Sequence, residues 1–167
     1  MKNDDSRAGG LKLRLRNLRR TPALRSLVRE TVLSPADFVM PYFVRAGKGV
    51  RNPISSMPGQ FQLSIDELVK EARALSKTGV GSVILFGIPS SKDARGSGAW
   101  ARNGITQQAV KALKDALPDL LVVTDVCLCE YTDHGHCGLL KGREVDNDST
   151  LPLLQKIAAS HMEAGAD

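Results

Sequence analysis

The sequence has few aromatic residues, few cysteines and no long apolar run. Phenylalanine, tryptophan and tyrosine together make up 4% of the 167 residues. The apolar runs are far too short to cross a bilayer, so we expect neither a transmembrane segment nor a membrane partner. The opening residues, MKNDDSRAGG, lack the apolar core of a signal peptide. We therefore expect a cytoplasmic protein.

Several motifs of common enzyme classes are also missing. The chain contains no GxxxxGK[ST] phosphate-binding loop, no GxGxxG dinucleotide fingerprint and no GxSxG nucleophile elbow. Its apolar content is nevertheless ordinary, with 42% hydrophobic and 25% charged residues, which indicates a folded globular protein. The length suffices for one domain with a core. It falls short of the roughly 250 residues that a complete (β/α)₈ barrel typically needs.

The net charge of +5 is concentrated at the N-terminus. Residues 1–30 hold nine Lys or Arg and three Asp or Glu, while the rest holds fourteen and fifteen. Leucines, including Leu11 and Leu13, alternate with the arginines in LKLRLRNLRRTPALRSLVRE. This mixture favours an arm over residues 1–34 that docks on a neighbouring subunit. A solvated tail and a nucleic-acid-binding arm are the alternatives, and we expect no nucleic acid partner.

Residues 35–167 show alternating strand and helix patterns. Strands are expected at 38–44, 82–86 and 120–126, and helices at 64–79, 106–117 and 151–164. Ser64 and Glu67 fit a capping box at the start of the first helix. Ser149 or Thr150 is expected to begin the last one. Such βα repetition predicts an α/β fold with a parallel sheet or barrel.

The last residues, Ala164-Gly165-Ala166-Asp167, read as a helix stop followed by the lead-in to a fourth strand. We therefore expect an incomplete barrel domain, three βα units long, over residues 35–167.

The three cysteines, Cys127, Cys129 and Cys137, lie within eleven residues. Residues two apart on an extended strand face the same way, so Cys127 and Cys129 can share one pocket with Asp125. The loop that follows, with glycines at 135 and 138, can return Cys137 to them. Three sulfur ligands suit Zn²⁺ and leave its fourth position open for catalysis. A redox pair and simple core packing are the alternatives.

Three polar residues near the cysteines have competing interpretations. His134 and His136 could replace a cysteine as ligand, although hydrogen bonding within the loop is the favoured reading. Asp125 could act as a general acid or base, or it could anchor the loop.

Six segments of the sequence resemble the delta-aminolevulinic acid dehydratase family, whose members are also called porphobilinogen synthases. The resemblance rests on RLRNLRRTPALRSLVRET, PYFVRAGKG, ISSMPGQFQLSIDELVKEA, SVILFGIP, TDVCLCEYTDHGHCG and EVDNDSTLPLL. It implies a (β/α)₈ barrel in a homo-oligomer, usually an octamer, whose N-terminal arm wraps a neighbour. It also implies the zinc-dependent condensation of two 5-aminolevulinate molecules to porphobilinogen, with loss of water, on the way to haem and other tetrapyrroles.

The resemblance assigns roles to particular residues. It makes Cys127, Cys129 and Cys137 the zinc ligands, puts Asp125 at the acidic position of the active site, and allows an additional Mg²⁺. The family's two Schiff-base lysines belong to later strands, so the resemblance implies that this chain alone is inactive. The alternative is a non-catalytic half-barrel that binds zinc or associates with other subunits.

Overall fold

The computed structural model describes residues 14–167, which divide into two compact units. The first unit ends at Leu33 and contains η1 (Leu15–Arg19) and α1 (Pro22–Leu27). Thr21 caps α1, because its side-chain oxygen accepts the Leu24 N–H at 3.1 Å. Leu11 and Leu13 of the predicted arm lie outside the described residues, and the boundary at residue 34 stays a prediction.

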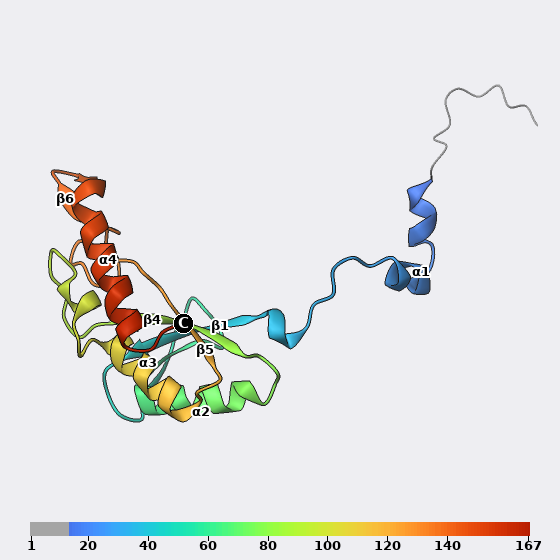
Figure 1. Cartoon of the computed structure of the whole chain (residues 1–167), viewed down its shortest axis with the longest axis horizontal. Coiled ribbons are helices and arrows are strands. Elements are labelled where there is room, and N and C mark those ends of the chain that lie inside the picture. Colours follow the sequence, from blue (N-terminus) through green and yellow to red (C-terminus); the bar gives the residue numbers. More distant parts are fainter. Residues whose placement is uncertain (1–13) are drawn as a thin grey trace, which may run out of the picture. The chain divides into compact units, whose positions relative to one another are not determined.

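The second unit, Ser34–Asp167, alternates strands and helices (Figure 1). Its elements are η2 (Pro35–Asp37), β1 (Val39–Arg45), β2 (Arg51–Pro53), β3 (Phe61–Leu63), α2 (Ile65–Ser76), β4 (Ser82–Ile88), η3 (Ser97–Trp100), α3 (Ile105–Ala116), β5 (Leu121–Thr124), β6 (Leu140–Lys141), β7 (Glu144–Val145) and α4 (Asn147–Glu163). The α/β class predicted from the sequence is confirmed.

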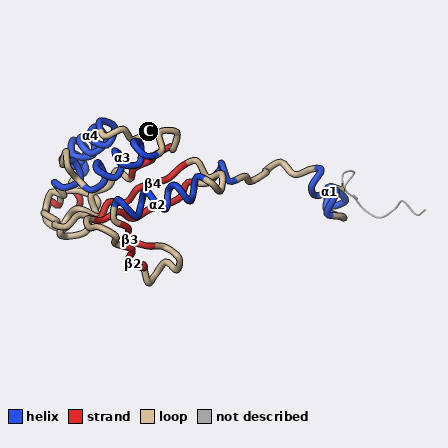
Figure 2. Tube along the Cα trace, turned by 90° about the horizontal axis from the view of Figure 1, so that it is seen from below, coloured by secondary structure: helices blue, strands red, loops and turns tan. Residues whose placement is uncertain are grey.

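Five strands form one sheet in the order β2-β3-β1-β4-β5. The pairs β3–β1, β1–β4 and β4–β5 are parallel, and only β2–β3 is antiparallel. Figure 2 shows the β2–β3 hairpin extending away from the helices. Because β1, β4 and β5 run parallel, their carboxyl ends meet at one edge, where the loops of the functional site emerge.

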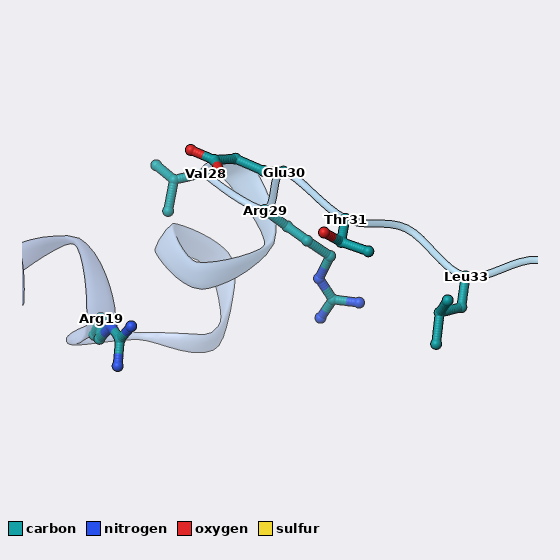
Figure 3. Close-up of a pocket in the computed structure, with 6 residues that line it drawn as sticks. All are labelled: Arg19, Val28, Arg29, Glu30, Thr31 and Leu33. Atoms are coloured by element: carbon teal, nitrogen blue, oxygen red, sulfur yellow. The ribbon is translucent and has the colours of Figure 1, made fainter.

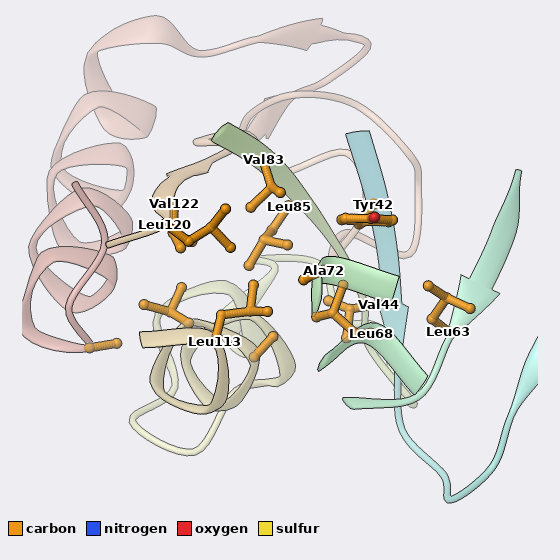
Figure 4. Close-up of a cluster of buried hydrophobic side chains, with 13 residues drawn as sticks. Tyr42, Val44, Leu63, Leu68, Ala72, Val83, Leu85, Leu113, Leu120 and Val122 are labelled. Carbon is orange, nitrogen blue, oxygen red and sulfur yellow. The ribbon is translucent and has the colours of Figure 1, made fainter. Parts of the chain in front are cut away.

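The main core lies between this sheet and the helices α2 and α3 (Figure 4). Alternate residues of the parallel strands supply its sheet side, for example Val83 and Leu85 of β4, which are fully buried. Leu68 of α2 and Leu113 of α3 cover them from the helices and are also fully buried. The apolar side chains at every second position of β4 therefore face the apolar side chains at helical spacing on α3, as the sequence pattern predicts.

A second apolar cluster joins α4 to the loops at the carboxyl edge. Its buried members are Ala99, Leu128, Tyr131, Leu153 and Ile157. The cluster matters for function because Leu128 and Tyr131 belong to the cysteine-bearing loop.

The start predicted for the first helix is confirmed but its capping box is not, and the start predicted for the last helix is wrong. Ser64 does precede α2, but its hydroxyl bonds the Asp66 carboxylate at 2.5 Å and accepts the Val50 N–H at 2.9 Å. Glu67 pairs with Lys70 instead of closing a capping box. The helix α4 begins at Asn147, earlier than expected, because the Asp146 side chain accepts the Ser149 N–H at 3.3 Å.

The strand expected over 120–126 is also shorter, since β5 ends at Thr124. No helix in residues 14–167 is both long and apolar enough to span a membrane.

Candidate metal centre

The three cysteines meet in the loop that follows β5. Their sulfur atoms all lie within 4.8 Å of one another, and the Cys127 and Cys129 sulfurs are 3.4 Å apart. Cys127 and Cys129 are half-buried, Cys137 is exposed, and none forms a disulfide. The predicted juxtaposition is therefore present, although Cys127 and Cys129 lie beyond the end of β5 and not on the strand itself.

A tight turn over residues 128–132 contains the second cysteine. Leu128 is completely buried in the second apolar cluster. The backbone N–H groups of Tyr131 and Thr132 both donate to the Leu128 carbonyl at 2.9 Å. The turn is thus anchored on its apolar side by Leu128, while the neighbouring cysteines stay partly accessible.

Cys137 returns to the other cysteines through a polar loop. The Thr132 hydroxyl donates to the His136 carbonyl at 2.9 Å, and Gly135 adopts the left-handed φ of +75° that the loop requires. Gly138 packs closely on α4, since a Cβ there would lie 2.5 Å from the Thr150 hydroxyl oxygen. Both glycines singled out in the sequence thus help the chain to turn back.

The cluster favours a cation electrostatically. Burial raises the pKa of the Cys129 thiol to about 12, and the hydrogen bond with Cys127 adds to that effect. Burial is also the main cause that raises the pKa of Glu130, followed by the charge of Asp125. The contact with Cys127 raises the pKa of the Cys137 thiol. Negative charge is thus disfavoured here until a cation compensates it.

Asp125 lies at the start of the same loop. Its backbone N–H donates to the Leu85 carbonyl at 3.1 Å, which continues the pairing of β5 with β4. Ligand atoms of Asp125, Cys127 and Glu130 lie within 4.8 Å of one another. The carboxylates of Asp125 and Glu130 therefore lie beside the Cys127 thiol.

The His134 ring bonds within the loops, as the favoured interpretation predicts, whereas the bonds of His136 are made by its backbone. The His136 N–H donates to His134 Nδ1 at 3.1 Å, and His134 Nε2 lies 3.3 Å from the Ala94 carbonyl oxygen. Neither histidine belongs to a cluster of three potential metal ligands among residues 14–167.

Two buried polar residues near the site are not identified by the sequence reasoning. The Tyr131 hydroxyl lies 2.8 Å from the Thr106 hydroxyl. His161 of α4 is buried, with Nδ1 3.0 Å from the Thr124 hydroxyl and no partner for Nε2 among residues 14–167. His161 follows Leu153 and Ile157 at helical spacing, and a polar residue on an apolar face is the signal that could have found it.

The lysines offer no buried amine. Within residues 14–167 every lysine is exposed except Lys114, which is half-buried and pairs with Asp167 at 2.9 Å. Lys141 lies on the short strand β6, while Lys111 and Lys156 lie on α3 and α4, within the helices predicted at 106–117 and 151–164.

The first unit contains a separate surface hollow of about 560 Å³ (Figure 3). It is lined by Arg19, Val28, Arg29, Glu30, Thr31 and Leu33, all of them exposed. These side chains point in different directions, and they bring no reactive groups together.

Comparison with known proteins identifies relatives of the chain. The family model described as delta-aminolevulinic acid dehydratase matches residues 12–167. The delta-aminolevulinic acid dehydratase of Methanothermus sociabilis is 51% identical over 154 residues, which cover 92% of this chain and 48% of the relative. That of Ruminiclostridium josui is 50% identical, with 92% and 75% covered. The chain thus spans about half the length of the first relative.

A solved structure is similar as well. The crystal structure of delta-aminolevulinic acid dehydratase from Toxoplasma gondii ME49, in complex with the reaction product porphobilinogen, superposes with a TM-score of 0.87 at 34% identity. The match covers 94% of this chain and 46% of the Toxoplasma chain.

Proposed function

The chain belongs to the delta-aminolevulinic acid dehydratase family, and on that premise we propose that it supplies the metal-binding part of a porphobilinogen synthase. The reaction condenses two molecules of 5-aminolevulinate to porphobilinogen with loss of water, and its product feeds tetrapyrrole and haem biosynthesis. One observation carries the proposal: three cysteine sulfurs converge within 4.8 Å at the carboxyl edge of a parallel sheet.

The donor set fits zinc. Thiolates at about 2.3 Å from a tetrahedral Zn²⁺ are separated from each other by about 3.8 Å. The spacing of the sulfurs of Cys127, Cys129 and Cys137 is compatible with that separation. Zinc held by these three residues would keep one position open and supply a Lewis acid that polarises a substrate oxygen or nitrogen. The exposed side of Cys137 leaves the thiols accessible to such a substrate.

Asp125 is the residue of this chain proposed to act on the substrate. Its backbone is bonded to the Leu85 carbonyl, and its carboxylate lies beside the Cys127 thiol. A carboxylate at this position can accept a proton from a substrate amine or bind its ammonium form.

The fold proposed for the second unit is part of a (β/α)₈ barrel with three βα units. The neighbouring parallel strands β1, β4 and β5, each followed along the chain by a helix, support it. The similarity to the Toxoplasma enzyme supports it further. Phe43 and Phe86 stack with ring centres 5.3 Å apart and remain half-buried, as side chains of an open barrel interior would.

We infer that the 167-residue chain alone does not form porphobilinogen. Schiff-base chemistry needs an amine in a desolvated pocket. Every lysine of residues 14–167 is exposed apart from Lys114, whose amine is held by Asp167 and the Leu120 carbonyl. This feature favours the second candidate function, a non-catalytic metal-binding or subunit-interaction half-barrel, for the chain by itself.

The arm is proposed to bind a further copy of the same chain. Leu15, Leu27 and Leu33 are at least 71% exposed, and arginines surround them in the sequence. Burial of these leucines on a second subunit would remove apolar surface from water. Sedimentation of the full chain against a chain of residues 35–167 tests this: the arm is not needed for assembly if both assemblies contain the same number of chains. The free thiols suit the reducing cytoplasm, where we place the protein.

Zinc analysis of the purified chain tests the metal site. The wild-type chain is expected to bind one zinc per chain, and Cys127→Ser/Cys129→Ser/Cys137→Ser to bind none. Undiminished zinc in the triple variant would show that other residues hold the metal. An assay with 5-aminolevulinate and zinc then separates the two functions, because porphobilinogen formed by the isolated chain would refute its proposed inactivity.

A further inference from the structure

A pair of hydroxyl groups connects the cysteine-bearing loop to the body of the fold. The Tyr131 hydroxyl lies 2.8 Å from that of Thr106, although 25 residues separate them. Tyr131 is 5% exposed and Thr106 2% exposed, so water does not compete for this bond. Thr106 is in the first turn of α3, which makes the start of that helix a fixed point for the loop.

The two hydroxyl groups pack against the backbone near the end of β4. Gly87 pairs with Val44 of β1 and is itself buried. A Cβ at position 87 would lie 2.2 Å from the Thr106 hydroxyl oxygen and 2.3 Å from that of Tyr131. The two hydroxyls therefore rest directly on the backbone of β4, in space that only glycine leaves free.

The backbone around Tyr131 is hydrogen-bonded to the loop that follows β4. The Tyr131 carbonyl accepts the Asp93 N–H at 3.3 Å, and the Asp93 carbonyl accepts the Asp133 N–H at 3.2 Å. These bonds form a parallel bridge between Asp93 and Thr132. A Cβ at Gly96 would lie 3.2 Å from the Tyr131 Cβ, so the two loops are in close contact.

In the cysteine-bearing loop, some residues present the thiols and others anchor the loop in the apolar cluster. Cys127, Cys129 and Cys137 gather their sulfurs at an accessible place, whereas Leu128 and Tyr131 are buried in the second apolar cluster. The anchors thus alternate with the thiols along the chain. Movement of the anchors would carry the sulfurs apart.

We propose that Tyr131 and Thr106 are positioning residues for the three-thiol site, and that their hydroxyl pair holds the cysteine-bearing loop closed on β4 and α3. The inference rests on the proposed function only in taking a thiophilic metal as the ligand of these sulfurs. Neither residue is among the candidate metal ligands. Their role is to keep the sulfurs together before the metal arrives and to slow its release.

The substitution Tyr131→Phe in the 167-residue chain removes one hydroxyl and leaves that of Thr106 buried without a partner. Loss of such a bond favours loop opening by about tenfold, which corresponds to ~1.4 kcal/mol. In the metal-free chain, amide hydrogen exchange over residues 128–137 is therefore expected to accelerate about tenfold, while exchange within α2 is unchanged. Release of Co²⁺ from the loaded chain to a chelator is expected to accelerate by a similar factor.

Two further variants make the test specific. Tyr42→Phe removes the hydroxyl of the other tyrosine, which is 4% exposed in the main core, and is expected to leave both rates unchanged. Tyr131→Phe/Thr106→Val removes both hydroxyls; because their bond is already lost in Tyr131→Phe, the double variant is expected to accelerate both rates no further than the single variant does.

Three results would overturn the inference or its premise. Rates within twofold of wild type in Tyr131→Phe would show that the hydroxyl pair holds nothing. Equal acceleration of exchange in α2 would indicate general destabilisation and no specific role in the loop. A wild-type chain that binds neither Zn²⁺ nor Co²⁺ would refute the proposed function, and amide exchange would still decide whether the pair holds the loop.

Discussion

Gly87→Ala is expected to be one of the most damaging methyl additions in the second unit. The new Cβ would approach two hydroxyl oxygens to 2.2 and 2.3 Å and the Ile105 Cγ2 to 3.1 Å. The Thr106 hydroxyl is on a short branched side chain at the start of a helix, and the Tyr131 ring is wedged against the loop after β4. Neither group can move aside without shifting backbone.

The magnitude follows from two costs. Overpacking of a well-packed site costs about 1–3 kcal/mol. The hydrogen bond that is lost when the hydroxyls separate adds about 0.5–1.5 kcal/mol. We expect the free energy of unfolding to fall by about 2–4 kcal/mol. For a unit of this size that corresponds to a fall in Tm of about 8–16 °C.

Thermal unfolding followed by circular dichroism measures this effect, with Gly81→Ala as the matched control. Gly81 immediately precedes β4, has no positive φ, and a Cβ there would meet nothing within 4 Å. Its replacement is expected to be neutral or slightly stabilising. A Gly87→Ala protein that melts within 2 °C of the Gly81→Ala protein would refute the close packing of the hydroxyl pair on β4.

Three other changes test the fold around the site. Leu113→Ala, in the centre of the main core, is expected to lower the free energy of unfolding by about 2–5 kcal/mol, and urea titration with an unchanged midpoint would contradict its burial. Burial lowers the pKa of His161 below 6.5, so the wild-type Tm should fall as the pH decreases below 6.5, because the unfolded chain then binds the proton more readily. His161→Gln should lose this pH dependence and can keep a bond to Thr124; an identical Tm profile in both proteins would exclude His161 as its source. Asp167→Asn removes the partner of Lys114, and its Tm deficit should disappear as the pH falls below 3.8, since the bonds of Asp167 keep its pKa low; a deficit that persists there would have another cause.

The fold could be predicted where apolar periodicity decides the structure. Val83 and Leu85 on β4 and Leu113 on α3 stand at strand and helix spacing, and the structure buries all three. The helix starts were harder to predict, because several polar residues competed for each one. At α2 the Ser64 hydroxyl bonds Asp66 and also accepts the N–H of Val50, a partner 14 residues away that only the folded chain brings near.

In the candidate site, too, the local features could be predicted from the sequence and the long-range contacts could not. Local spacing and two loop glycines were enough to predict that the three cysteines, Cys127, Cys129 and Cys137, lie together. The partnership of Tyr131 with Thr106 could not be found like that, because it joins the loop to a helix 25 residues earlier in the chain. His161 reaches Thr124 over 37 residues. Contacts of this kind depend on the packing of whole elements, which no local pattern encodes.

The alternation of cysteines with buried anchors has an evolutionary consequence. Leu128 and Tyr131 fix the loop from its apolar side, whereas Cys127 and Cys129 contribute only half-buried side chains. The side chains at positions 127, 129 and 137 can therefore change in evolution without disturbing the buried residues that hold the loop in place.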